Sequence, residues 1–346
     1  MIAARNGHRQ RARLVSVGSY APERVVTNEE IAQTVDTDDA WIVARTGIRE
    51  RRFAAPDESA SDMAMVASQE ILEQAGLDPA ELDWVIVPTS TPDHIFPSTA
   101  AILAERLGAR GAAAYDLSAA CAGFVYGLSQ AAALIEAGLG RHALVVGSDQ
   151  LATRLIDHTD RGTCILFGDG AGGALVSAGD EETTGGFLGF EIGADGSGAD
   201  LLTIPAGGSV EPITPDTPPG RAKIHMNGRE VFKFATRIMV ESPMRLLDRL
   251  EMSIHEIDLL IAHQANSRIL DAAVKRLGIS EEKVFNNLDR YGNTSAASIP
   301  LAMKEARDQG RMRPGDLLLL CGFGGGLTWA TTVVRYEPLP PGASPA

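Results

Sequence analysis

One arrangement of a helix, a turn and a buried strand occurs twice in this sequence, and it restricts the folds that the chain can adopt. Residues 68–90 and 242–266 share this order, with a short acidic and apolar segment before each strand. After a further helix-bearing interval, each copy reaches a loop of small residues that opens another helix, at 117–124 and 292–300. Alternation alone is common in α/β proteins, but the matching order and spacing favour a duplication. We therefore predict two copies of one α/β unit packed as a pseudo-dimer.

Short apolar runs alternate with helical patterns along the chain. The runs have the length of buried strands and cover residues 82–87, 143–146, 165–167, 259–262 and 317–320. The helical patterns cover residues 63–75, 123–137 and 237–250. This alternation predicts mixed or parallel sheets covered by helices. The segment 207–221, which is rich in Pro and Gly, is predicted to form an irregular loop.

Composition excludes several classes of protein. Of the 346 residues, 45% are hydrophobic and 22% are charged, and the net charge of −14 disfavours a general nucleic-acid surface. The apolar stretches are far shorter than a membrane span of roughly 20 residues. No apolar run follows the arginines of residues 1–13, so we expect no signal peptide. The three cysteines are too widely spaced for a disulfide framework or a CxxC pair. We expect a soluble, cytoplasmic α/β protein.

Cys121 differs from the other two cysteines in its surroundings. It lies among small residues where an amphipathic helix begins. The positive end of a helix dipole lowers the pKa of a thiol, which predicts a reactive thiolate. A small buried cysteine that only packs against a sheet is the equally favoured alternative. Cys164 and Cys321 lie within strand patterns and are predicted to be structural.

His263 and Asn293 are the candidate partners of Cys121. His263 ends a buried strand, at the edge of an α/β sheet where such folds build their sites. Asn293, in a Gly-Asn-Thr-Ser loop, holds the place in the second repeat that Cys121 holds in the first. Pseudo-symmetry would bring Cys121 and Asn293 to one central cleft near His263. Taken alone, an Asn after a Gly is more often a turn residue.

Two glycine-rich segments could form binding loops. Residues 168–173 fit GxGxxG, but an apolar, strand-like run follows them instead of a helix, so we reject a dinucleotide site. No phosphate-binding loop of the GxxxxGK[ST] type occurs. Residues 322–326 could present backbone N–H groups to an oxyanion, although a simple turn is an equally good interpretation.

Cys, His and Asn in this order fit two classes of enzyme. A papain-like peptidase has its His roughly 130–150 residues after its Cys, as here. However, the CGSCW-like signature of that class is missing around Cys121, and so are the disulfide cysteines. The other class is the condensing enzymes.

Six motifs point to one family of condensing enzymes. They are TDDAWIVARTGIRER (37–51), AACAGF (119–124), TDRGTCILFGDGAG (159–172), HQAN (263–266), GNTSAAS (292–298) and GFGGGLTW (322–329). From about residue 14 to residue 336 the sequence resembles the 3-oxoacyl-ACP synthase III family, the initiating condensing enzymes of bacterial fatty-acid synthesis.

This resemblance implies a thiolase fold with α-β-α-β-α layers. Each of its two pseudo-symmetric halves would be a mixed five-stranded sheet with helices. The halves would cover residues 13–183, with the nucleophilic Cys, and 184–337, with the His and the Asn. Residues 1–12 would be a flexible extension, and 338–346 a disordered tail.

The resemblance also implies roles for the candidate residues. Cys121 would take an acyl group from acyl-CoA, and malonyl-ACP would then be decarboxylated and condensed to 3-oxoacyl-ACP, with release of CO₂ and CoA. His263 and Asn293 would stabilise the enolate. The backbone N–H groups of Cys121 and Gly325 would form an oxyanion hole.

Further residues would bind the substrates by the same resemblance. Trp41 and Arg161 would sandwich the CoA adenine, with Arg45, Thr46 and Asn266 along the CoA and pantetheine. Phe96 would cap the acyl pocket of a partner subunit and suggests a short primer. Lys233, Arg268, Lys275 and Arg276 would bind the acyl carrier protein, unless they are only a solvated helix face. Arg229 and Ala330 depart from the usual family pattern.

The expected partners are acyl-CoA, malonyl-ACP and a second copy of the chain, with no nucleic acid and no membrane. No cofactor and no metal are expected, because acyl-CoA is a substrate. Two alternatives stay open: a relative in secondary metabolism that primes a polyketide or transfers its acyl group to oxygen or nitrogen, and a silent binding module of the same fold.

Overall fold

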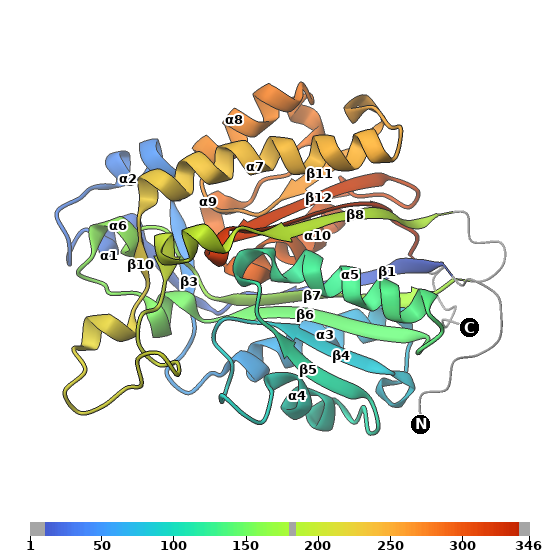
Figure 1. Cartoon of the computed structure of the whole chain (residues 1–346), viewed down its shortest axis with the longest axis horizontal. Helices are drawn as coiled ribbons and strands as arrows, with labels where there is room; N and C mark the ends of the chain where they lie inside the picture. The colour runs from blue at the N-terminus through green and yellow to red at the C-terminus, as the bar shows by residue number, and fades with distance from the viewer. Residues whose placement is uncertain (1–10, 180–184, 339–346) are drawn as a thin grey trace.

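The computed structural model describes residues 11–179 and 185–338. Its two main sheets lie between three layers of helices (Figure 1). The first sheet has the order β1 (Ala12–Tyr20), β7 (Gly170–Ala178), β6 (His142–Asp149), β4 (Trp84–Pro88) and β5 (Ala113–Leu117). The second has the order β11 (Leu259–Ala262), β12 (Leu317–Gly324), β13 (Thr328–Arg335) and β8 (Gly186–Ala194). In both sheets the strands pair partly in parallel and partly antiparallel.

The helices form the outer and middle layers. Helices α3 (Ala60–Ala75) and α4 (Thr99–Leu107) cover the first sheet, and α7 (Gly228–Arg249) and α8 (Ser267–Leu277) cover the second. Between the sheets lie α5 (Gly123–Glu136) and α10 (Ser298–Asp308), in a buried core to which both sheets contribute. The predicted α-β-α-β-α layering is therefore confirmed. Within the described residues, no helix is long and apolar enough to cross a membrane.

Shorter elements build the side of the molecule near the ends of the central helices. They are the paired strands β2 (Arg24–Thr27) and β3 (Glu50–Phe53), the pair β9 (Leu202–Thr203) and β10 (His225–Met226), and the helices α1 (Asn28–Ile31), α2 (Asp39–Thr46), α6 (Arg161–Cys164) and α9 (Leu288–Tyr291). Most of the Pro- and Gly-rich segment 207–221 is irregular, as predicted.

The second sheet has four strands in the described part of the chain, so our prediction of a fifth strand there is wrong. Beside the edge strand β11, Val284 forms a single parallel bridge to Leu260. The Phe285 N–H still binds the Leu260 carbonyl at 3.0 Å, but two residues later the N–H of Asn287 binds the side-chain oxygen of Gln264 at 3.2 Å instead of a strand, and the pairing stops.

Two further expectations about elements are wrong. Residues 165–167 form a turn after α6 with one bridge at Phe167, not a strand, because three apolar residues alone do not distinguish a strand from a buried turn. Cys164 accordingly ends α6. Helix α7 begins at Gly228, well before the predicted residue 237, because the side chain of Asn227 caps its first turn by accepting from the Glu230 N–H.

Both halves contain the same strained turn, which identifies equivalent residues. Ala120 (φ 47°) opens the 3-10 turn before α5, and Ser295 (φ 53°) opens the one before α10. The residue that follows is Cys121 in one half and Ala296 in the other. The residue equivalent to Cys121 is therefore Ala296, and our expectation that Asn293 takes this place is wrong by three residues. The two loops of small residues look alike in sequence, but the structural equivalence lies in the turns that end them.

Each of these turns is covered by a strand from the other half. A Cβ atom on Gly324 of β12 would come within 2.5 Å of the Cys121 nitrogen. In the same way, a Cβ atom on Gly147 of β6 would come within 2.6 Å of the Ala296 carbonyl oxygen. Only glycine allows the backbones to approach this closely.

The proposed limits of the two halves stay a prediction. The boundary between residues 183 and 184 lies outside the described residues, as do residues 1–10 of the expected extension and 339–346 of the expected tail. Ala12, which we assigned to the extension, is the first residue of β1 and is fully buried.

Candidate active site

A cavity of about 220 Å³ lies where the two halves meet. Cys121, His263 and Asn293 all line it, so the structure brings together the three residues that the sequence singled out. Much of the remaining wall is apolar, with contributions from Leu202, Phe232 and Leu327. This environment suits an acyl chain next to a few polar groups.

Cys121 lies in the 3-10 turn Ala120–Ala122 that leads into α5. Its side chain is buried, and burial raises the pKa of the Cys121 thiol to about 12. This is opposite to the direction that we expected from the helix N-terminus, because the loss of hydration at this buried position outweighs the helix dipole. The thiol is therefore protonated at neutral pH before a substrate binds.

Two buried neighbours affect this thiol in opposite directions. The Ser295 hydroxyl lowers the pKa of Cys121, and the charge of Asp149 raises it. Asp149 is itself buried at the end of β6, where it accepts hydrogen bonds from the backbone N–H groups of Ser90 (2.6 Å) and Ala296 (3.3 Å). Among the described residues, the hydroxyl of Ser295 has no hydrogen bond of good geometry. It nevertheless lies close enough to Cys121 and Asp149 to favour the charged form of both side chains.

His263 is held rigidly at the end of β11. Its backbone N–H binds the carbonyl of Cys321 at 2.8 Å, and its Nδ1 atom lies 2.6 Å from the hydroxyl of Ser298. The edge of its ring packs against Phe323. Burial lowers the pKa of His263 to about 3, so the imidazole is neutral near pH 7.

Asn293 is fixed through its backbone and its side-chain oxygen. Its N–H binds the Leu166 carbonyl at 2.8 Å, and its carbonyl accepts from the Gly168 N–H at 3.0 Å. Its Oδ1 atom accepts from the Ser295 N–H at 2.9 Å. Because the oxygen is engaged, the Nδ2 group is the one that can donate into the cavity.

The mouth of the cavity carries the predicted CoA-binding residues. Trp41 lies outside the cavity, with the guanidinium groups of Arg45 and Arg161 at 4.0 and 4.8 Å from its ring centroid. Arg161 also binds the Asp36 carbonyl at 2.9 Å. A planar base that stacked on a face of Trp41 covered by one of these guanidinium groups would displace it.

Arg45, Thr46 and Asn266 line the cavity itself. The hydroxyl of Thr46 is engaged by the Ile42 carbonyl at 2.8 Å. Asn266 caps α8 by accepting from the Arg268 N–H at 2.9 Å, and its Nδ2 group donates to the Arg45 carbonyl at 3.0 Å. Asn266 therefore connects the start of α8 to the end of α2.

Other predicted residues lie apart from the cavity. Gly325 begins the 3-10 turn after β12, next to Gly324. Phe96 is 84% exposed and does not line the cavity of its own chain. Arg229 is exposed at the start of α7, whereas Ala330 is buried in β13.

The four predicted carrier-binding cations lie on α7 and α8. Lys233 pairs with Glu230 at 2.7 Å, and Arg276 donates to the Thr236 carbonyl at 2.9 Å. Arg268 stacks on Phe232, while Lys275 belongs to the last turn of α8. The four side chains therefore belong to two helices that pack against each other.

The remaining motifs have structural roles or none that we can assign. The GxGxxG match runs into β7, not a helix, as expected. Cys164 and Cys321 are buried, and burial raises their pKa values to about 11 and about 12. Among the described residues, no group of three His, Cys, Asp or Glu side chains could hold a metal ion.

Sequence reasoning missed Asp149, Ser295, Ser298 and Gln264. One signal was present for Asp149, an acidic residue at the end of a buried strand. The others act through contacts between distant segments, and their local sequence gives no indication of that.

Known proteins resemble this chain over nearly its whole length. Family models described as 3-oxoacyl-[acyl-carrier-protein (ACP)] synthase III and as its C-terminal part match residues 115–196 and 247–336. The β-ketoacyl-[acyl-carrier-protein] synthase III of Desulfitobacterium hafniense is 52% identical over 325 residues, covering 94% of this chain and 97% of that protein.

Two solved structures extend the comparison. The β-ketoacyl-[acyl carrier protein] synthase III of Thermus thermophilus superposes with a TM-score of 0.87 at 47% identity, covering 94% of this chain and 100% of that one. The priming β-ketosynthase of the R1128 polyketide pathway superposes with a TM-score of 0.90 at 39% identity, covering 97% and 99%.

Proposed function

The chain belongs to the 3-oxoacyl-[acyl-carrier-protein] synthase III family, and from this premise we propose how its residues carry out the reaction. It is a condensing acyltransferase that performs the initiating condensation of fatty-acid synthesis. The observation that carries the residue assignment is the single cavity lined by Cys121, His263 and Asn293. With all three present, neither a papain-like peptidase nor a silent module is needed to explain the site.

The first half-reaction is acylation of Cys121. Its sulfur attacks the carbonyl carbon of acyl-CoA, and the oxyanion that forms is bound by the backbone N–H groups of Cys121 and Gly325. The bond between the carbonyl and the CoA sulfur then breaks, and the thiol proton leaves with CoA. Because burial holds the pKa of Cys121 near 12, proton removal must accompany attack, so substrate binding and chemistry are coupled.

The second half-reaction begins with decarboxylation of malonyl-ACP. The bond to the carboxylate breaks, CO₂ departs, and the electron pair forms an enolate of the thioester. The Nδ2 group of Asn293 and the Nε2–H of His263 donate to the enolate oxygen. A neutral imidazole has one N–H, and an Nδ1 that accepts from Ser298 places this proton on Nε2.

Condensation completes the cycle. The enolate carbon attacks the acyl carbonyl on Cys121, the bond to sulfur breaks, and the resulting thiolate takes a proton from solvent. The overall reaction consumes acyl-CoA, malonyl-ACP and one proton, and it yields 3-oxoacyl-ACP, CO₂ and CoA. That no cofactor or metal takes part stays a prediction.

We assign substrate binding to the residues at the mouth. The adenine of CoA would lie between Trp41 and Arg161, and the pantetheine would pass Arg45, Thr46 and Asn266. Lys233, Arg268, Lys275 and Arg276 would receive the acidic carrier protein on α7 and α8. Arg229, exposed at the start of α7, could add to this contact.

A homodimer is the expected assembly. Strand β5 is an edge of the first sheet, and an unpaired edge can accept a strand from a second copy. The loop before α4 exposes Ile95 (89%) and Phe96 (84%). Asp116 of β5 accepts from the Thr99 N–H at 2.8 Å and so fixes this loop beside the edge. A partner that covered β5 would bury both side chains, with Phe96 reaching its acyl pocket. A cytoplasmic location stays a prediction.

Priming of a polyketide is the second candidate function. The R1128 priming β-ketosynthase has a similar fold, and 39% of its aligned residues are identical to those of this chain. The higher identity to the fatty-acid enzyme of D. hafniense, 52%, favours fatty-acid initiation. The two functions differ in the primer and in the carrier protein, not in the reacting groups.

Intact-protein mass spectrometry tests this function. The protein is mixed with acetyl-, propionyl- and isobutyryl-CoA in turn, and then with malonyl-ACP. We expect an acyl adduct on Cys121 that disappears as 3-oxoacyl-ACP forms, and no adduct in Cys121→Ser. Asn293→Ala should acquire the adduct and keep it during the malonyl step. An adduct that persists in the unmodified protein would instead indicate a different acceptor.

A further inference from the structure

We propose that Glu305 is a positioning residue for the two enolate-binding groups, His263 and Asn293. The inference rests on the proposed function of these two residues. Glu305 lies near the end of α10, away from the cavity, and none of its atoms lines the site. It acts through the segment that leads to Asn293 and through the residue that follows His263.

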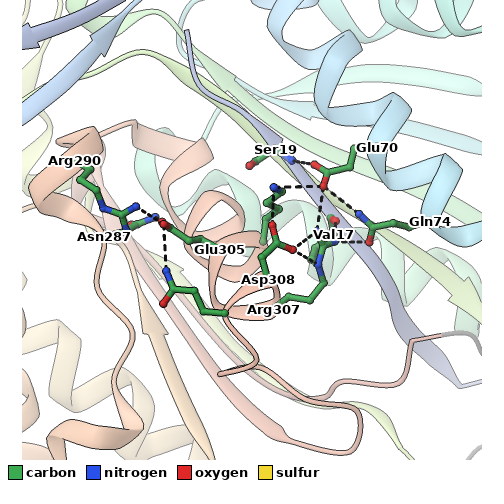
Figure 2. Close-up of polar contacts among 11 residues, drawn as sticks. Val17, Ser19, Glu70, Gln74, Asn287, Arg290, Glu305, Arg307 and Asp308 are labelled. Atoms are coloured by element: carbon green, nitrogen blue, oxygen red, sulfur yellow. Dashed lines mark hydrogen bonds and ion pairs between the residues drawn. The ribbon is translucent and has the colours of Figure 1, made fainter. Parts of the chain in front are cut away.

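Both oxygens of Glu305 are used to hold that segment. Oε2 accepts from the Nδ2 group of Asn287 at 2.9 Å, and Oε1 pairs with the guanidinium of Arg290. Figure 2 shows Arg290 and Asn287 converging on this carboxylate. The side chain of Glu305 is only 16% exposed, so water can replace these contacts poorly.

Asn287 transmits the contact toward His263. Its backbone N–H donates to the Oε1 atom of Gln264 at 3.2 Å, and the Nε2 group of Gln264 donates to the Ala262 carbonyl at 2.7 Å. Gln264 directly follows His263, and both Asn287 and Gln264 are buried. A displacement of Asn287 would therefore leave a buried amide unpaired next to His263.

Arg290 transmits the contact toward Asn293. It belongs to α9, which ends where the Gly292 N–H binds the Leu288 carbonyl at 2.9 Å. Asn293 is the next residue. The ion pair with Glu305 thus fixes the short helix that leads into Asn293.

Helix α10, which carries Glu305, also contacts His263 directly. Ser298, the first residue of α10, lies 2.6 Å from Nδ1 of His263, and Glu305 follows about two turns later on the same face. Helix α10 therefore sets the positions of both enolate donors, one from its start and one from its end.

Asp308 provides a matched control on the same helix. It pairs with Lys304 and Arg307, each at 2.6 Å, and Arg307 continues to Glu70 of α3 at 3.1 Å. Figure 2 shows this second group beside the first. It ties α10 to the first half of the molecule and does not touch the segment that ends at Asn293.

The test compares Glu305→Gln with Asp308→Asn in two half-reactions. Glu305 accepts from Asn287 on Oε2 and from Arg290 and Gln309 on Oε1, whereas glutamine offers a single acceptor oxygen. At least one of these contacts is therefore lost without a change in shape. We expect Glu305→Gln to slow decarboxylation of malonyl-ACP about 10²-fold, the effect of a small misplacement of reacting groups. Acylation of Cys121 by acyl-CoA should change less than about twofold, and Asp308→Asn should change both rates less than about twofold.

A double variant distinguishes positioning from general damage. If Glu305 acts through Asn293, then Glu305→Gln in an Asn293→Ala background should slow decarboxylation less than it does alone. Equal losses in both half-reactions, or no loss in either, would overturn the inference. If the unmodified protein neither acquires an acyl group nor decarboxylates malonyl-ACP, the proposed function itself fails.

Discussion

The Nδ1 atom of His263 lies 2.6 Å from the hydroxyl oxygen of Ser298, the first residue of α10. This contact joins the end of a strand in the second sheet to the start of a central helix. A serine hydroxyl can donate to an unprotonated Nδ1 or accept from an Nδ1–H. The proposed mechanism needs the first arrangement, which leaves the proton on Nε2, the nitrogen that donates to the enolate.

Ser298→Ala should slow malonyl-ACP decarboxylation while leaving Cys121 acylation intact. Without the hydroxyl, the proton can move to Nδ1 and one of two enolate donors is lost, which typically costs about 10²-fold in rate. The measurement is CO₂ release from malonyl-ACP by the acylated protein. Decarboxylation at the unmodified rate would mean that Ser298 does not set the tautomer.

Ser295→Ala and Asp149→Asn should change the reactivity of Cys121 in opposite directions. The hydroxyl lowers the pKa of the thiol and the carboxylate raises it, so the first variant should react more slowly with iodoacetamide and the second faster. The readout is alkylation of the Cys121 peptide at fixed pH, with thermal melts to show that each variant is folded. Rates that move in the same direction would contradict the assignment.

Gly324→Ala should abolish or strongly slow acylation, whereas Gly325→Ala should be much milder. A Cβ atom at residue 324 would come within 2.5 Å of the Cys121 nitrogen, but one at residue 325 would first meet the Leu202 oxygen at 3.3 Å. Displacing the Cys121 turn should cost about 10²-fold in the rate of acyl-enzyme formation. Similar rates for the two variants would show that the turn can move without loss.

Acid should destabilise the protein partly through His263. The pKa of this group is about 3 in the folded protein and 6.5 ordinarily, because it is buried. Above pH 6.5 both states carry a neutral ring; as the pH falls from 6.5 toward 3, only the unfolded chain binds the proton, and stability decreases.

The corresponding measurement is Tm in His263→Gln and in the unmodified protein. The fall in Tm between about pH 7 and about pH 4 should be smaller in the variant. His142 and His158 are present in both proteins, so their lowered pKa values cancel in the comparison. An identical fall would mean that His263 is not neutral in the folded state.

The alternation of apolar runs and helical patterns was sufficient to predict sheets covered by helices, and the family resemblance supplied the layered thiolase fold. Residues 259–262 were predicted as a strand and form β11, and the small-residue loop at 117–124 does open α5. Prediction was wrong for residues 165–167, where a short apolar run is a buried turn, and for a fifth strand in the second sheet, where only a single bridge forms at Val284. Such outcomes depend on tertiary contacts.

The candidate site was likewise predictable only in part. Cys121 and His263 are recognisable from their places at a helix start and a strand end, but the raised pKa of Cys121 depends on burial that no local pattern reveals. Arg51 is a further example: within its charged motif it resembles a solvated residue, yet it is fully buried and donates to the Ile165 carbonyl at 2.8 Å.

The interlocked turns have a consequence for how this protein could be divided. Gly324 packs over the turn of Cys121, and Gly147 packs over the turn of Ala296, so each half covers the turn of the other half with one of its strands. A fragment that ended near residue 179 would expose its nucleophile turn and lose the residues that the second sheet and α10 contribute to the shared core. The two repeats are therefore not separable modules, and they should fold and unfold as one cooperative unit.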